Sequence, residues 1–128
     1  MSIQGKTASQ RQLRVGEELR HAIAGILERG DIRDPAIAQR SITVTEVTVS
    51  PDLRQASVYV VPLGGGDSAG LLAGLRRAAP FLRRALAREV QLRVVPELAF
   101  EADTSFDRAD RIEQLLASPT VRRDLDDD

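Results

Sequence analysis

Six arginines surround one proline in the second half of this chain of 128 residues. Around Pro80 stand Arg76, Arg77, Arg83, Arg84, Arg88 and Arg93. A guanidinium group presents a planar fork of N–H donors that matches the oxygens of a phosphate. Proline is also well suited to the first position of a helix, where the next backbone N–H groups lack intrahelical partners. Free N–H donors beside clustered guanidinium groups suit a phosphate backbone, so the pattern predicts a nucleic-acid contact rather than catalysis.

The expected break at Pro80 follows from the chemistry of proline. Pro80 cannot donate to the carbonyl of Arg76, and its ring disfavours helical geometry at Ala79. We therefore expect one helix from Ser68 to about residue 79 and a second over residues 80–90, with an exposed helix start between them. A bound anion would satisfy its free N–H groups. The competing interpretation is that solvent satisfies them and that the arginines pair with the acidic C-terminal segment.

The charges along the chain are segregated, although the formal net charge is only −1. Residues 76–93 contain six Arg and one Glu, a local charge of +5, whereas residues 97–128 contain ten acids and four Arg, a local charge of −6. The first 75 residues hold eight groups of each sign. A field with this polarity can steer an anionic partner even when the total charge is close to zero.

Composition excludes several classes of protein. The length fits one domain with a single core. The absence of cysteine excludes disulfides, thiol nucleophiles and cysteine metal sites, and it fits a reducing compartment. No apolar run reaches the roughly 18 residues of a membrane span, and the N-terminus lacks the apolar region of a signal peptide. We expect a cytoplasmic protein that neither uses a membrane nor binds a small-molecule substrate.

Residues suited to catalysis or metal binding are scarce. His21 is the only histidine, and its place on or beside the apolar stripe of a helix favours a structural role. No acidic or histidine spacing matches a metal site, and no nucleophile–base pair is visible. The aromatic residues are too few for a base-stacking platform. The sequence therefore predicts a non-enzymatic protein with no catalytic residue, no metal site and no cofactor.

The first half of the chain predicts a helix followed by a hairpin. Apolar residues recur with helical spacing over residues 10–29, with Ser9 as N-cap and Gly30 as the stop. The strand that follows changes apolar phase at Glu46, which indicates a β-bulge. A turn at residues 50–52 leads to a second strand, in which Tyr59 faces away from the apolar side.

The second half predicts two helices, a strand and a further helix. A glycine-rich loop at residues 63–67 precedes the helices described above, and residues 97–103 alternate as a third strand. A last helix is expected over residues 105–117. The order is αββααβ plus this helix, an α+β domain with a small mixed sheet and helices on one sheet face. Residues 1–8 are expected to be disordered, residues 9–117 to form the domain, and residues 118–128 to form a flexible acidic tail.

Four passages of the sequence resemble one bacterial family. They are AREVQLRVVPELAF at residues 87–100, DIRDP at residues 31–35, TVTEVTVSPDLRQASVYV at residues 43–60 and DRADRIEQLL at residues 107–116. With the element order and the interrupted helix, they resemble the ribosome-binding factor A family of small-subunit assembly factors. The similarity covers about residues 9–117, and the combination of passages is more specific than any one of them.

The resemblance implies a type II KH-like fold and a cytoplasmic monomer. It further implies binding to the 30S subunit through 16S rRNA, with a role in late maturation and 16S rRNA processing. In that family an Ala-x-Gly kink replaces the GxxG loop of ordinary KH domains. The matching residues here are Ala78, Ala79 and Pro80, so proline stands at the glycine position and should stiffen the kink.

A second class of function competes with RNA binding. In it the chain is a protein-interaction module whose six arginines dock on an acidic protein surface. Affinity for 30S subunits before and after ribonuclease treatment separates the two classes.

Overall fold

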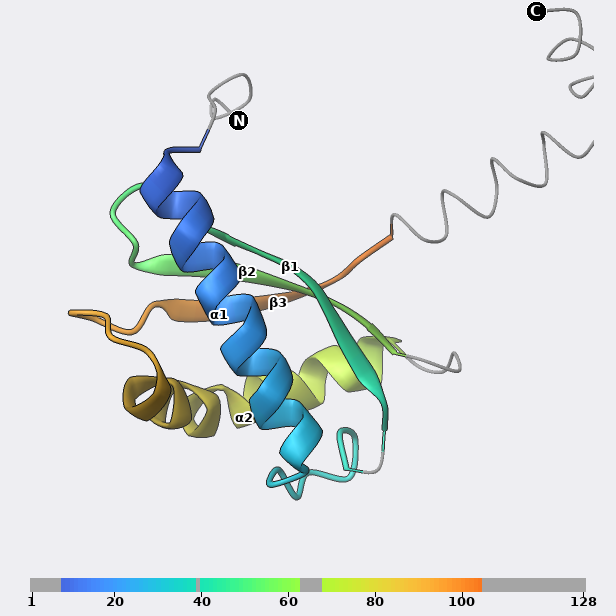
Figure 1. The fold of residues 1–128 in the computed structure, drawn as a ribbon. Helices are drawn as coiled ribbons and strands as arrows, with labels where there is room; N and C mark the ends of the chain where they lie inside the picture. Colours follow the sequence, from blue (N-terminus) through green and yellow to red (C-terminus); the bar gives the residue numbers. More distant parts are fainter. Residues whose placement is uncertain (1–7, 39, 63–67, 105–128) are drawn as a thin grey trace, which may run out of the picture.

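The computed structural model describes residues 8–38, 40–62 and 68–104. Its elements are helix α1 (Gln10–Arg29), strands β1 (Ile42–Val49) and β2 (Gln55–Pro62), helix α2 (Ser68–Glu89) and strand β3 (Glu97–Ala102). The three strands form one sheet in the order β1-β2-β3, and Figure 1 shows both helices on the same side of it. The predicted loop at residues 63–67, the last helix at residues 105–117 and the acidic tail at residues 118–128 lie outside the described residues.

Helix α1 begins and ends where the sequence predicts. The Ser9 side chain accepts from the N–H of Gln12, whose own side chain accepts from the N–H of Ser9, so the two residues form a capping box. At the other end Gly30 adopts a left-handed conformation with φ 74°, which glycine accommodates without steric cost. Its buried stripe includes Leu19, Ile23 and Ile26, and these side chains face the sheet and α2.

Backbone lies close to backbone where α1 crosses β1. A Cβ atom on Gly16 would stand 2.5 Å from the carbonyl oxygen of Val47, so only glycine permits this approach. One turn earlier the Gln12 amide donates to the carbonyl of Val49 at 3.0 Å. These two contacts hold the first half of α1 against the outer strand.

The hairpin confirms the predicted bulge and turn. Strands β1 and β2 are antiparallel, and their register shifts between Val44 and Glu46. In the turn, the N–H of Leu53 donates to the carbonyl of Ser50 at 2.8 Å, and Leu53 has a positive φ of 62°. A left-handed conformation costs a leucine about 1–2 kcal/mol. Packing the half-buried Leu53 side chain against the core offsets that cost.

Strand β3 returns parallel to β2, which confirms the predicted mixed sheet. One face of the sheet carries Val58, Val60 and Phe100, all buried beneath the helices. On the opposite face Tyr59 is neighboured by Glu46 on β1 and Glu101 on β3, as the register requires. Among the described residues, the sheet is therefore buried on one side only.

The predicted break into two helices is wrong, because α2 is a single helix with Pro80 inside it. It begins at Ser68, where the first of the two helices was expected to begin, and ends at Glu89. The buried stripe continues on both sides of the proline, whose own side chain is exposed; it includes Leu71, Leu75, Leu82 and Leu86. Burying a leucine contributes roughly 1.5–3 kcal/mol, whereas proline inside a helix costs about 3 kcal/mol. A continuous helix keeps the leucines before and after Pro80 on one buried stripe, and this packing offsets the local cost of the proline.

The glycines of α1 provide a test of the close approach to β1. Gly16→Ala should lower the free energy of unfolding by about 1–3 kcal/mol, because the added methyl group meets the Val47 carbonyl. Gly25→Ala is the matched control, since nothing lies within 4 Å of its added Cβ. It should raise stability by roughly 0.5–1 kcal/mol through helix propensity. Urea midpoints measure both variants, and equal effects would contradict the contact.

Pro80→Ala tests whether the proline strains α2. Alanine restores a donor for the Arg76 carbonyl, which recovers part of the roughly 3 kcal/mol cost of proline. It also raises the conformational entropy of the unfolded chain, which lowers the free energy of unfolding by about 1 kcal/mol. We expect the free energy of unfolding to rise by about 1–2 kcal/mol. A fall in the urea midpoint would show instead that the packing around α2 needs the proline geometry.

Candidate nucleic-acid interface

Two of the six candidate arginines contact the polypeptide around β3. The guanidinium group of Arg83 donates to the carbonyls of Pro96 at 3.1 Å and Val95 at 3.0 Å, and it lies 3.4 Å from the Glu97 carboxylate. Arg76, two helical turns earlier, donates to the carbonyl of Phe100 at 3.4 Å. Both side chains therefore bind β3 and the loop that leads into it to α2.

Arg77 is paired with an acid from the loop after α1. Its guanidinium group donates to both carboxylate oxygens of Asp34, at 2.7 and 3.0 Å. Asp34 also accepts from the N–H of Ala36 at 2.9 Å. The Arg77 bond first and the Ala36 N–H second lower the pKa of Asp34 from 3.8 to about 2. Arg77 thus fastens this loop to α2, and its charge is already balanced.

The other three candidates have no such partner. Arg84 and Arg88 are exposed on α2, and Arg93 is exposed on the loop that leads to β3. None of them makes a hydrogen bond or ion pair with another described residue. Arg77, Arg84 and Arg88 are spaced by seven and four residues, so they share one side of the helix. The acidic segment offered as an alternative partner for the arginines lies largely outside the described residues.

The anion-binding helix start predicted at Pro80 is absent. Because α2 runs unbroken from Ser68 to Glu89, residues 81–83 lie in its interior and are not the first turn of a new helix. Any attraction of this region for phosphate must come from the side chains of Arg84 and Arg88. Ala78 is buried, Ala79 half-buried and Pro80 exposed, so this segment serves packing on one side and faces solvent on the other.

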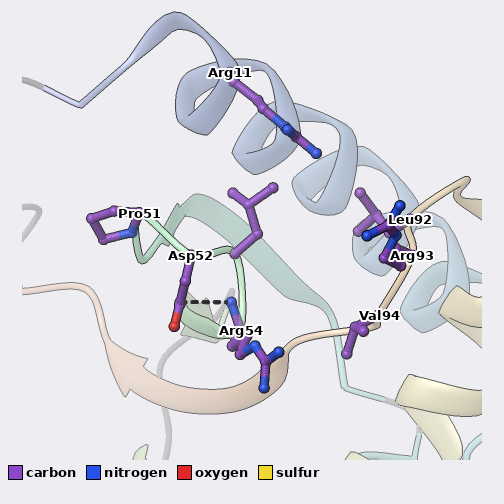
Figure 2. Close-up of a pocket in the computed structure, with 8 residues that line it drawn as sticks. Arg11, Pro51, Asp52, Arg54, Leu92, Arg93 and Val94 are labelled. Carbon is purple, nitrogen blue, oxygen red and sulfur yellow. Dashed lines mark hydrogen bonds between the residues drawn. The ribbon is translucent and has the colours of Figure 1, made fainter.

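A basic groove that the sequence did not predict lies beside the β1–β2 turn, at the end of the sheet where β3 begins. It has a volume of about 520 Å³, and its walls come from the start of α1, the β1–β2 turn and the loop before β3. Figure 2 shows Arg11 above the gap, Arg54 below it and Arg93 on the far wall. The signal available in the sequence was Arg11 in the first turn of a helix, where the helix dipole disfavours a cation.

The uncovered face of the sheet has the opposite charge. Glu46 and Glu101 are exposed on either side of the half-buried Tyr59. Burial first, and then the charge of Glu101, raise the pKa of the Tyr59 hydroxyl. The negative charge of these two carboxylates disfavours the approach of a polyanion to this face.

Other candidate chemistry is limited in the part of the chain that the structure describes. The side chain of His21 is exposed and lies 3.6 Å from the Glu17 carboxylate, so it is outside the apolar stripe. Within residues 8–38, 40–62 and 68–104, no group of three or more His, Cys, Asp or Glu side chains could hold a metal ion. Neither described helix is long and apolar enough to span a membrane.

Comparison with known proteins identifies the family. The model of the family described as Ribosome-binding factor A matches residues 11–116. The chain belongs to this family. Ribosome-binding factor A of Paramagnetospirillum magneticum is 64% identical over 126 residues, which cover 98% of this chain and 89% of that protein. The Maricaulis maris protein of the same name is 58% identical over 121 residues, covering 94% and 86% respectively.

Solved structures of the ribosome-binding factor A family share the fold. The crystal structure of the Thermus thermophilus protein superposes with a TM-score of 0.62 at 32% identity, covering 71% of this chain and 93% of that one. A homology model of the Thermus thermophilus factor, fitted into a cryo-EM map of its complex with the 30S subunit, gives a TM-score of 0.56 at 32% identity. It covers 70% of this chain and 91% of that one. The α+β, KH-like fold implied by the resemblance is confirmed, with α2 in one piece.

The Asp34–Arg77 pair predicts a measurable titration. In Arg77→Ala the pKa of Asp34 should rise from about 2 toward 3.8 but stay below it, because the Ala36 N–H still donates. In the parent, the stabilisation from this lowered pKa is complete above the ordinary pKa and disappears as the pH falls through about 2. Carboxyl NMR shifts followed against pH measure both values. An unchanged pKa in Arg77→Ala would contradict the pairing.

Proposed function

We propose that this chain is a non-enzymatic assembly factor of the small ribosomal subunit that acts in the cytoplasm as a monomer. It binds the 30S subunit through 16S rRNA and assists late maturation and 16S rRNA processing. Membership of the ribosome-binding factor A family supports the partner, as does the homologue fitted into a 30S complex. The observation in this molecule that carries the proposal is the set of exposed, unpartnered arginines, which include Arg84, Arg88 and Arg93.

The arrangement of charge supports RNA as the target. Uncompensated guanidinium groups among the described residues include those of Arg84 and Arg88 on α2 and Arg93 on the loop before β3, whereas Glu46 and Glu101 lie on the sheet face that neither described helix covers. A polyanion is therefore attracted to one side of the molecule and repelled by the other, which orients the protein as it approaches. Phosphate contacts set position and affinity but carry no base sequence. Specificity for one rRNA site then has to come from shape and from further contacts.

The side chains that the structure describes bear on the non-enzymatic part of the proposal. Among the described residues, no charged or polar side chain is buried. Catalytic groups usually need burial or close neighbours to shift their pKa values. The lowered pKa of Asp34 arises from an ion pair that fastens a loop to α2, and it has no nucleophile beside it.

Docking on an acidic protein surface is the second candidate function, because exposed arginines also suit carboxylates. Sedimentation of the full chain with purified 30S subunits, before and after mild ribonuclease digestion, decides between the two. Binding that disappears with the RNA supports the proposal. Binding that survives digestion supports the protein-docking alternative and overturns the assignment to rRNA.

Single alanine substitutions on α2 test which of its arginines neutralise RNA phosphates. Arg84→Ala and Arg88→Ala should each weaken 30S binding and make the plot of log affinity against log salt shallower by about one unit. Arg77→Ala is the matched control from the same helix side, and it should change the slope less because Asp34 already balances that charge. Titrations at several salt concentrations measure the slopes. Equal slopes for all three variants and the parent would remove α2 from the RNA contact.

A further inference from the structure

The groove at the start of α1 brings together three arginines that are far apart in the sequence. Arg11 comes from the first turn of α1, Arg54 from the end of the β1–β2 turn and Arg93 from the loop between α2 and β3. All three are exposed, and none makes a side-chain hydrogen bond or ion pair with another described residue. Folding places like charges around one concavity, although each side chain could have pointed elsewhere into solvent.

The one acid that lines the groove does not neutralise it. The Asp52 carboxylate accepts from the Ser50 hydroxyl at 2.7 Å and from the N–H of Arg54 at 3.0 Å, so it is held within the turn. These hydrogen bonds lower the pKa of Asp52 and keep it charged. Three guanidinium groups against one carboxylate leave a net charge of +2 around the groove. The remaining positive charge favours an anion.

The walls between the arginines are apolar. Leu53 and Leu92 are half-buried there, and Val94 is 50% exposed although it is a large aliphatic residue. Leu53 is also the described non-glycine residue with a positive φ, so an unfavourable backbone conformation places its side chain at this wall. A small inorganic anion would use only the arginines. A ligand with both a charged and an apolar part would use the leucines as well.

From this combination we infer that the groove binds one unpaired nucleotide of an RNA strand. Arg11, Arg54 and Arg93 take the phosphates on either side, and the base lies against Leu53 and Leu92 with its flat face open to a guanidinium plane. The volume of about 520 Å³ lies within the range of clefts that enclose small ligands. A splayed-out base fits such a concavity, whereas the bases of a duplex are stacked and paired inside the helix and cannot enter it.

This inference deepens the proposed function and rests on it, because it adds a second contact to the same RNA partner. Loop residues 90–96 join the C-terminal end of α2, which carries Arg88, to the groove wall that carries Arg93. One RNA strand that follows this loop would meet phosphate contacts on α2 and then the groove. In Figure 1 this loop extends toward the β1–β2 turn, beyond the end of α2.

The test uses the full chain with a short single-stranded oligoribonucleotide and, separately, with purified 30S subunits. Arg11→Ala, Arg54→Ala and Arg93→Ala should each weaken single-strand binding about tenfold, the effect of losing one hydrogen-bonded charge. Arg33→Ala is the matched control, since Arg33 is exposed, lacks a described partner and lies outside the groove. Leu53→Gly removes the apolar wall while glycine tolerates the positive φ. It should weaken binding without changing the salt slope, and urea midpoints confirm that each variant is folded.

The outcomes separate the groove from the proposed function. If the parent binds 30S subunits and the three groove variants bind RNA as well as Arg33→Ala does, the groove inference is overturned and the proposed function stands. If the parent fails to bind 30S subunits, the proposed function fails, while loss of oligonucleotide binding in the groove variants alone still supports the groove. A photoreactive residue at Val94 should crosslink to RNA within the 30S complex. Crosslinks to ribosomal protein alone would overturn the inference.

Discussion

Val58, Val60 and Phe100 lie on the single sheet face that both helices cover, and this one-sided burial constrains the rest of the molecule. A three-stranded sheet is too small to fold without such a cover, so α1 and α2 must pack side by side on one face. The loops that join helices to strands then meet at the ends of the sheet. No element of the part that the structure describes covers the other face, and Glu46 and Glu101 are exposed on it. Burial thus decides which face of the sheet the described helices occupy and which side chains stay at the surface.

The arginines divide according to this constraint. Arg76 and Arg83 attach β3 to α2, and Arg77 attaches the loop after α1. Because α2 packs beside β3, the guanidinium groups of Arg76 and Arg83 reach backbone carbonyls of β3 and the loop before it, and they donate to these carbonyls. Arg84 and Arg88 are exposed and remain available. The six arginines of this sequence cluster therefore divide evenly: three fasten the fold, and the proposed RNA contact depends on the other three, Arg84, Arg88 and Arg93.

Local signals predicted the elements well where packing agreed with them. Ser9 and Gly30 cap the two ends of α1. The change of apolar phase at Glu46 coincides with the β-bulge. The prediction failed at Pro80, because a local rule for proline met a buried stripe that continues on both sides of it. The cost of one missing hydrogen bond is local, whereas the gain from burying Leu82 and Leu86 comes from contacts with distant residues. Local sequence patterns reveal the cost of the missing hydrogen bond. They do not reveal the gain from burying the leucines against distant residues.

The sequence by itself determined the α+β order, the segregation of charge and the family resemblance, since these depend on spacing and composition along the chain. Only the tertiary structure decided which charges are free. Asp34 and Arg77 stand 43 positions apart and pair because the loop after α1 folds onto α2. Arg11 and Arg93 meet at one groove only because β3 runs parallel to β2 and brings its leading loop to the start of α1. Ion pairs and grooves form between groups that are close in space, and sequence distance carries no record of that closeness.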